Sequence, residues 1–431
     1  MQNSGVKLID SMQISKHLFL LKRRKIPGQL VIQLTDKCNA HCPQCGMRST
    51  VKFQRTKLPL DDVKRILDAA AENGVKAVSF TGGEPFLFFE ELCHLMKYAG
   101  QLKIEYIRTG TNGFFFQNTK GSNFESKIKT IAEKLAGTPV RNFWISIDSA
   151  VPEIHERMRG FPGVISGIEK SLPIFHEFDI YPSVNLGINR NMAPNTIGID
   201  PSRFETDADL IREIYHNYKA AFKMFYRFII DMGFTMVNMC YPMSVTPETD
   251  ESVLNPVYAA TSPSDIVRFH TTEKMLLFRA LLRTVLEFRS EIRVFTPLSS
   301  LYALTMQLAH GPPAAYPCRG GIDFFFIDSR DGNTYPCGYR GNENFGKYWE
   351  IDWDKVHSNG DCHLCDWECF RDPSELFGPI LQSVSNPLDL IKKIKNDPRY
   401  FRLWGNDLNY YRACNFFNGR CAPDYKKLNK F

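Results

Sequence analysis

Three cysteines near the N-terminus lie close enough in the sequence to bind one metal centre. Cys38, Cys42 and Cys45 have the spacing C-x3-C-x2-C. A structural zinc site or a closed iron–sulfur site takes four protein ligands, whereas this stretch supplies three thiols. Three thiolates around a four-iron cluster leave one iron open to bind a substrate or cofactor. His41 could complete a zinc site instead, and a disulfide or unrelated buried thiols are further alternatives.

Seven more cysteines fall in the last quarter of the chain and indicate a second metal-binding region. They are Cys318, Cys337, Cys362, Cys365, Cys369, Cys414 and Cys421. The segment 321–336 predicts a hairpin, which would bring the first two of these cysteines together. We expect auxiliary iron–sulfur binding, and the alternative is a zinc knuckle made by Cys362, Cys365, Cys369 and one more ligand.

The composition predicts an intracellular globular protein with reduced thiols. Of 431 residues, 43% are hydrophobic, 23% are charged and 12 are cysteines. A formal net charge of +6 is too small to predict a nucleic-acid partner. No apolar run approaches the length of a membrane span, and the N-terminus lacks the pattern of a signal peptide, so we expect a cytoplasmic protein. Cys93 and Cys240 lie in apolar patterns typical of buried structural thiols.

Apolar strand patterns alternate with helical patterns from residue 29 onward. Strands are predicted at 30–34, 77–80, 104–107, 143–148, 182–188, 234–239 and 292–295. Helices are predicted at 60–73, 89–99, 122–136, 164–175, 207–232 and 264–289. Strands joined by single helices run parallel, so about six βα units predict an α/β fold with a parallel barrel.

Three regions are expected along the chain. Residues 1–28 have the pattern of a basic amphipathic helix that covers one end of the barrel or, alternatively, contacts a membrane surface or an anionic partner. Residues 29–309 form the barrel. A stretch rich in Gly and Pro starts near residue 310, and we expect residues 310–431 to form a small cysteine-rich domain.

Polar residues follow several of the predicted strands, where the sites of parallel α/β folds collect. Gly82 to Glu84 end the second strand, where glycines would let a ligand approach the backbone and Glu84 could accept from an ammonium group. Ser146 and Asp148 share one face at the end of the fourth strand, and Asn185 lies on the fifth. The alternatives are a plain turn, a helix cap and a satisfied interior amide. Asn112 follows the third strand and could be a site residue or, equally, part of a plain Asn-Gly turn.

The cysteine spacing and the strand-end residues together resemble the radical S-adenosylmethionine (SAM) superfamily. The resemblance implies that Cys38, Cys42 and Cys45 hold a 4Fe-4S cluster whose open iron binds SAM, which is then cleaved to a deoxyadenosyl radical. Gly82-Gly83-Glu84-Pro85 is similar to the family segment that binds the SAM amino group. Ser146 and Asp148 would then meet the ribose, and Asn185 the nucleoside. The segment 155–163, which contains Arg159, resembles an Arg-Gly segment of some relatives, with a structural role.

The C-terminal cysteines resemble the SPASM or twitch extension of radical SAM proteins. The spacing Cys318-x13-Gly332-x4-Cys337 is similar to its opening, but the pattern departs from the family at Cys369 and Cys414. The resemblance implies one or two auxiliary 4Fe-4S clusters, without assigning the ligands. Closed clusters would relay electrons, whereas an open iron could hold substrate.

The function expected from this resemblance is hydrogen abstraction from a peptide or protein side chain. The alternatives are a radical SAM enzyme acting on a lipid or other small molecule, or a non-catalytic iron–sulfur electron carrier. A reductant such as flavodoxin or ferredoxin is an expected partner, together with a possible membrane contact through the N-terminus. The reaction class and the catalytic side chains stay open.

Overall fold

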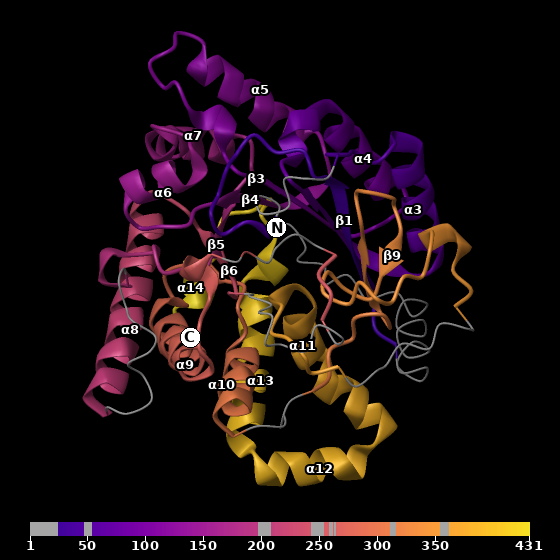
Figure 1. Ribbon diagram of the computed structural model, residues 1–431, viewed down its shortest axis with the longest axis vertical. Coiled ribbons are helices and arrows are strands. Elements are labelled where there is room, and N and C mark those ends of the chain that lie inside the picture. The colour runs from indigo at the N-terminus through magenta and orange to yellow at the C-terminus, as the bar shows by residue number, and fades with distance from the viewer. Residues whose placement is uncertain are drawn as a thin grey trace, which may run out of the picture.

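In the part of the chain that the structure describes, the fold is built on one nine-stranded sheet. The computed structural model describes residues 25–46, 54–196, 208–242, 254–257, 262, 264–310, 316–353 and 362–431, so the predicted N-terminal helix lies largely outside the described residues. The strand order is β7-β6-β5-β4-β3-β2-β1-β8-β9. All neighbours are parallel except β8 and β9, which confirms the predicted α/β fold with a parallel sheet (Figure 1).

The strands and helices alternate along the chain. The strands are β1 (Gly28–Thr35), β2 (Val75–Gly82), β3 (Tyr106–Thr111), β4 (Val140–Ser146), β5 (Ser183–Gly187), β6 (Met236–Cys240), β7 (Arg293–Val294), β8 (Phe324–Ile327) and β9 (Thr334–Tyr335). The helices of the barrel are α3 (Leu60–Glu72), α4 (Phe89–Gln101), α5 (Phe124–Ala136), α6 (Pro152–Arg159), α7 (Val164–Glu177), α8 (Ala208–Asp231), α9 (Thr271–Phe288) and α10 (Leu298–His310).

Helix α3 shows why these segments form helices against a sheet. Its buried residues Val63, Ile66, Leu67 and Ala70 recur at helical spacing, so they make one apolar face toward the sheet. Two acidic residues in its first turn favour the positive end of the helix dipole. Burial of β1 is nearly continuous along its length, as expected for a parallel strand that is covered on both faces.

The region beyond α10 continues the barrel sheet. Strand β8 pairs with β1 in parallel, from Gln29 opposite Phe324 to Ile32 opposite Ile327, and β9 returns antiparallel to β8. The domain boundary placed near residue 309 therefore remains a prediction. No helix among the described residues is long and apolar enough to cross a membrane.

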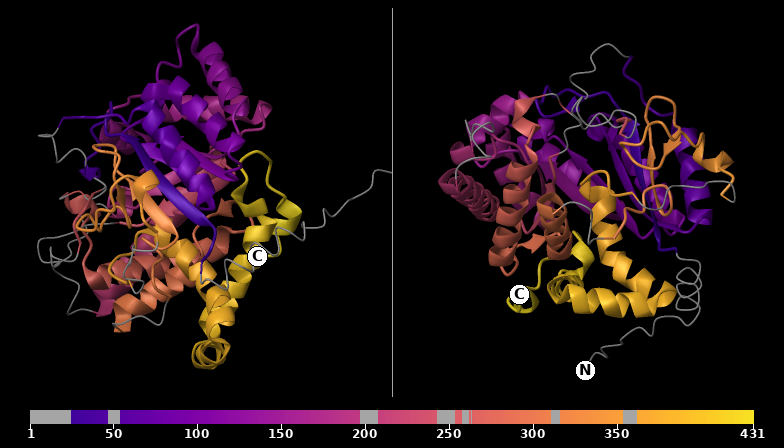
Figure 2. Two further views of the ribbon diagram at one scale, coloured as in Figure 1. Left: turned by 90° about the vertical axis from the view of Figure 1, so that its right-hand side faces the viewer. Right: turned by 60° about the horizontal axis from the view of Figure 1, so that its bottom comes forward.

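Helices at the C-terminus pack against the barrel and close one end of it. They are α11 (Glu368–Ser385), α12 (Pro387–Asn396), α13 (Pro398–Ala413) and α14 (Tyr425–Leu428), drawn in yellow tones in Figures 1 and 2. Asp407 on α13 accepts the N–H groups of Leu298 and Ser299 at 3.0 and 2.8 Å and pairs with Arg289. Further on, the N–H of Gly419 donates to the carbonyl of Arg141 at 2.7 Å, near the start of β4. The chain's last segment thus lies at the end of the barrel opposite the cysteine loop.

Candidate active site

The cysteine loop lies directly after β1. Cys38 is exposed, Cys42 is buried and Cys45 is half-buried, and the N–H of Cys45 donates to the carbonyl of Cys42 at 3.1 Å. Burial raises the pKa of Cys42 to about 12; Arg159 opposes this rise, and Asp148, Cys45 and Cys38 add to it. The three thiols therefore lie within electrostatic range of one another.

The donor set of this loop fits a cluster with one open iron. It supplies three thiols on a single short loop, which is the ligand set that such a cluster requires. Within the described ranges, no group of three or more His, Cys, Asp or Glu side chains is arranged to hold a single metal ion. Thiols bind metals as thiolates, so binding here must release protons from groups whose pKa burial has raised.

Gly82 and Gly83 bring the end of β2 against the start of the cysteine loop. The N–H of Gly83 donates to the carbonyl of Thr35 at 2.6 Å, and the N–H of Glu84 donates to that of Lys37 at 2.9 Å. A Cβ on Gly82 would lie 2.3 Å from the Thr35 oxygen, and one on Gly83 would lie 2.2 Å from the Lys37 oxygen. The chain's own backbone fills the space on the Cβ side of both glycines and positions the residue before Cys38. Approach of a ligand to the backbone of Gly82 and Gly83 stays a prediction.

Glu84 is held by backbone donors at the base of the site. Its side chain is buried, and its two oxygens accept the N–H groups of Phe86 at 3.0 Å and Asn112 at 2.6 Å. Burial raises the pKa of Glu84 to about 7, and these hydrogen bonds oppose the rise. The Asn112 amide also donates to Asn39 at 2.9 Å and lies 3.7 Å from the Cys38 sulfur. Asn112 therefore joins β3 to the cysteine loop, a role that its Asn-Gly context did not reveal. Binding of an ammonium group by Glu84 remains a prediction.

Asp148 lies in a buried ion pair beside the loop. Its oxygens accept from Arg159 Nε at 2.7 Å and Arg159 Nη2 at 3.0 Å. The N–H of Asp148 donates to His155 Nδ1 at 3.0 Å, and its carbonyl accepts from Asn189 Nδ2 at 2.9 Å. Ser146 at the end of β4 is half-buried and lies opposite Asn185 in the sheet register. Contacts of Ser146 and Asp148 with a ribose remain predictions.

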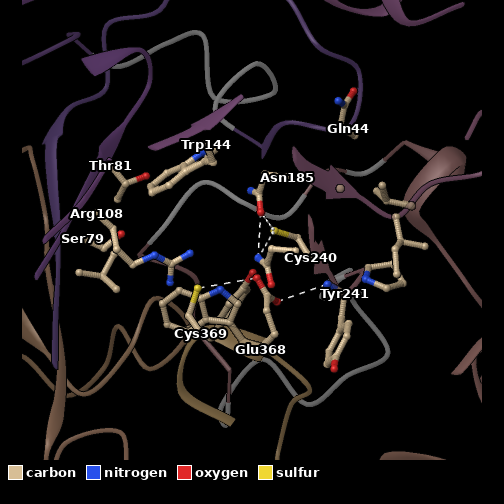
Figure 3. A pocket seen from close by; sticks show the side chains of 18 of the residues that line it. Gln44, Ser79, Thr81, Arg108, Trp144, Asn185, Cys240, Tyr241, Glu368 and Cys369 are labelled. Carbon is tan, nitrogen blue, oxygen red and sulfur yellow. Dashed lines mark hydrogen bonds between the residues drawn. The ribbon is translucent and has the colours of Figure 1, made fainter. Parts of the chain in front are cut away.

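A cavity of about 210 Å³ lies inside the barrel, between Gln44 of the cysteine loop and the first residues of α11 (Figure 3). The Asn185 oxygen accepts from the Asn238 amide at 2.8 Å and from the Cys240 thiol at 3.3 Å in its wall. Contact of Asn185 with a nucleoside stays a prediction. Figure 3 shows Arg108, Trp144 and Glu368 around the same space.

Sequence reasoning missed several of these lining residues. Arg108 had an available signal, because a charged residue in the middle of a buried parallel strand must face either a partner or a cavity. Cys240 was expected to be a structural thiol, but it lines this cavity.

Comparison with known proteins identifies the N-terminal half of this site. Residues 32–188 match the Radical SAM superfamily, and this segment contains the cysteine loop, Glu84 and Asp148. Residues 32–188 are a radical SAM domain. Members of this superfamily are enzymes that use a 4Fe-4S cluster and SAM, so the chain carries the domain of a radical SAM enzyme, and its reaction class is open.

Two curated radical SAM relatives differ in how much of the chain they match. The "AdoMet-dependent heme synthase" of Methanosarcina barkeri is 25% identical over 357 residues, which cover 79% of this chain and 89% of the synthase. The "GTP 3',8-cyclase" of Syntrophomonas wolfei is 27% identical over 172 residues, covering 38% of this chain and 48% of the cyclase. The chain thus matches about half the length of this cyclase.

Two solved radical SAM structures are similar at lower identity. Streptococcus suis SuiB bound to S-adenosylmethionine has 18% identity and a TM-score of 0.48, covering 83% of this chain and 76% of SuiB. Native anSMEcpe with bound AdoMet has 14% identity and a TM-score of 0.47, covering 88% of this chain and 100% of anSMEcpe.

Four of the C-terminal cysteines of this radical SAM enzyme come together. The N–H of Cys318 donates to the carbonyl of Cys362 at 2.8 Å. Burial raises the pKa of Cys337 to about 12, and the charges of Cys318 and Cys362 add to the rise. Burial also raises the pKa of Cys365, with Cys337 and Cys318 adding to it. The number and type of these four thiols fit a closed cluster, although among the described residues no three Cys, His, Asp or Glu side chains are arranged to hold a single metal ion.

The other three predicted ligands lie elsewhere. Cys369 belongs to the first turn of α11, and its thiol lies 3.7 Å from Glu368 at the barrel cavity. Cys414 follows α13, and the Cys421 thiol contacts the carbonyl of Asn418 at 3.4 Å, at the opposite end of the barrel. The structure therefore brings together four of the seven, and the role of the remaining three as ligands stays a prediction.

Proposed function

We propose that this enzyme cleaves SAM at a cluster held by Cys38, Cys42 and Cys45 and removes a hydrogen atom from a substrate group inside the barrel cavity. When bound, the cluster and SAM supply the hydrogen-abstracting radical. The observation that carries the proposal is the convergence of three thiols, Glu84 and the Asp148–Arg159 pair at the mouth of one radical SAM domain.

The chain's own residues would orient the cofactor and exclude water. Gly83 and Asn112 fix the loop that carries Cys38, through hydrogen bonds to Thr35 and Asn39. Trp144 and Trp367 line the cavity, and their apolar rings would displace water from around a reactive radical. Such a radical reacts with the nearest hydrogen, so the position of the bound group decides which bond is broken.

We propose a side chain of a peptide or protein as the first substrate candidate. A cavity of about 210 Å³ can take a group of side-chain size. The opening of the C-terminal cysteine pattern also resembles the extension found in peptide-modifying enzymes. A small-molecule substrate is the second candidate, because the relative named AdoMet-dependent heme synthase matches 79% of the chain.

We propose one closed auxiliary cluster held by Cys318, Cys337, Cys362 and Cys365. The proximity of these four thiols supports it. A closed cluster has no free iron for substrate, so its role would be to relay electrons, with a flavodoxin or ferredoxin as the external reductant.

Replacing Cys42 with Ala tests the proposed function. Deoxyadenosine formation from SAM is measured anaerobically after iron reconstitution, alongside iron and sulfide content. The Cys42→Ala protein should lose SAM cleavage, while the matched variant Cys93→Ala, whose thiol is buried on α4, should retain it. Deoxyadenosine formation by Cys42→Ala at the wild-type rate would contradict the proposal. Adding total peptide or small-molecule extracts to the wild-type enzyme separates the two substrate candidates by which extract accelerates turnover.

A further inference from the structure

Arg108 is a cation that lacks a carboxylate partner among the described residues of the barrel. It lies in the middle of β3, and no carboxylate of these residues lies within ion-pair distance of its guanidinium. Its Nε is buried and has no hydrogen-bond partner. Three buried arginines of this chain each face a carboxylate: Arg159 pairs with Asp148, Arg190 with Glu273 and Arg289 with Asp407. The buried Arg293 instead donates to Thr235 and to the carbonyl of Asn418. Arg108 as a whole is half-buried. A charge held partly away from water without a counter-ion is costly, so a ligand that pairs with Arg108 recovers part of that cost on binding.

Aromatic rings hold this guanidinium in place. Its central carbon lies 5.4 Å from the ring centroid of Trp144 and 5.3 Å from that of Phe295. Gly110 makes room for the indole, because a Cβ there would lie 2.1 Å from the Trp144 ring. Figure 3 shows the guanidinium pointing from β3 into the cavity, toward Cys369. Stacking fixes the plane of the guanidinium and leaves its N–H groups for another partner.

The surroundings of Arg108 select the charge and shape of that partner. Ser79 lies beside it in the sheet register, and Thr81 follows on the same face of β2, so two hydroxyls line the cavity next to the cation. Among the described lining residues, Arg108 is the one cation. Glu368 lies on another part of the wall and accepts the N–H of Tyr241 at 3.3 Å. A ligand therefore meets a cation on one part of the wall and, on another, the carboxyl of Glu368, whose pKa burial raises to about 7.

We propose that Arg108 binds a carboxylate group of the substrate and thereby orients the substrate inside the barrel. A planar guanidinium matches a carboxylate through two parallel N–H···O bonds. A single guanidinium neutralises one carboxylate charge, whereas a phosphate dianion would need further positively charged side chains. Arg108 is the one cation among the described lining residues, so the carboxylate end of the substrate points to it. This inference rests on the proposed function for the reaction that follows binding, but the binding step itself does not require SAM cleavage.

Chemical labelling of Arg108 tests the proposal on the reconstituted full chain under anaerobic conditions. Butanedione, a small arginine reagent, is applied with propionate, propionamide or inorganic phosphate as the probe, and labelled peptides are quantified by mass spectrometry. Propionate at roughly ten times its half-protecting concentration should slow labelling of Arg108 about tenfold, since only the free fraction reacts. Propionamide has the same shape without the charge and should not protect.

Arg141 on β4 is the matched control site. Its central carbon lies 5.4 Å from the Tyr106 ring, and its buried Nε also lacks a hydrogen-bond partner, but it lies outside the cavity. Its labelling should not respond to propionate. The proposal is overturned if Arg108 resists labelling without any probe, if propionate and propionamide protect within about twofold of each other, or if both arginines are protected alike. Stronger protection by phosphate than by propionate would overturn the carboxylate assignment. Failure of SAM cleavage in the wild-type enzyme would instead contradict the proposed function.

Discussion

Replacing Asp148 with Asn tests how much the buried ion pair stabilises the barrel beside the cysteine loop. Asp148 is 1% exposed and Arg159 is 8% exposed, and two hydrogen bonds of 2.7 and 3.0 Å join them. Asn preserves the shape of the side chain but removes its charge, so the guanidinium loses its counter-ion. Burial alone would lower the pKa of Arg159, but Asp148 raises it above its ordinary value, so this arginine stays charged.

The expected loss of free energy of unfolding arises because the Arg159 charge is left buried and unpaired. Removing one partner of a buried pair costs about 3–5 kcal/mol. We expect the lower end, about 3 kcal/mol, because the backbone contacts of Asp148 to His155 and Asn189 do not depend on its charge. A loss of this size is a large share of a typical free energy of unfolding of about 5–15 kcal/mol.

Urea unfolding of Asp148→Asn, Arg159→Met and the double variant measures the coupling between the two side chains. The double variant should lose less free energy of unfolding than the sum of the single variants, by about 2 kcal/mol, because it leaves no unpaired charge. Glu291→Gln is the control, since Glu291 pairs with Arg227 at the surface and its loss should leave the unfolding midpoint unchanged. A loss below about 1 kcal/mol for Asp148→Asn, or coupling near zero, would refute this reasoning.

Three further outcomes follow from the structure. Gly83→Ala should cost about 1–3 kcal/mol of stability and reduce iron retention, because its Cβ would meet backbone before the cysteine loop, whereas Gly405→Ala has free space and should do neither. Cys365→Ala should lower the iron bound per chain, and Cys421→Ala should leave it unchanged; equal losses would contradict the four-cysteine assignment. Burial lowers the pKa of His155 from 6.5 to about 4. The unfolded chain then binds the extra proton, so stability is full above pH 6.5 and falls by up to about 3 kcal/mol toward pH 4. Urea unfolding measured from pH 4 to pH 6.5 should show that the free energy of unfolding depends less steeply on pH for His155→Gln than for the wild type. An equal dependence on pH would argue against a neutral buried imidazole.

The sequence predicts the alternating elements well because local patterns determine them. The helix expected at 60–73 is α3 (Leu60–Glu72), and the strand expected at 30–34 is the centre of β1 (Gly28–Thr35). The amphipathic period and the acidic first turn of α3 are visible without tertiary information. The position of the cysteine loop after the first strand follows from the same alternation.

Cysteine spacing alone did not predict which C-terminal thiols meet. Cys362 and Cys365 precede α11, whereas Cys369 lies in its first turn and is directed to the barrel cavity. Helix α13 has 16 residues, a length of about 24 Å, and it separates Cys414 from the region of α11. These cysteines look alike in the sequence, but they lie in three different places: before α11, at the barrel cavity and beyond α13. Only the path of the helices shows this difference.

Local sequence patterns also could not predict which side chains pair inside the barrel. The Asp148–Arg159 pair and the open guanidinium of Arg108 depend on which side chains the curved sheet directs inward. The sequence of Gly82 and Gly83 also cannot show that the backbone of Thr35 and Lys37 approaches them.

The pairing of β8 with β1 has a consequence for how the chain is made. Strand β1 (Gly28–Thr35) leaves the ribosome before its partner β8 (Phe324–Ile327), because the other strands of the parallel sheet lie between them in the chain. Until then one side of β1 presents unpaired N–H and C=O groups, which can pair with other nascent chains. A fragment that ends just after α10 would keep the unpaired edge of β1 exposed, because β8 would be missing. The cysteine-rich region therefore also protects the first strand from aggregation.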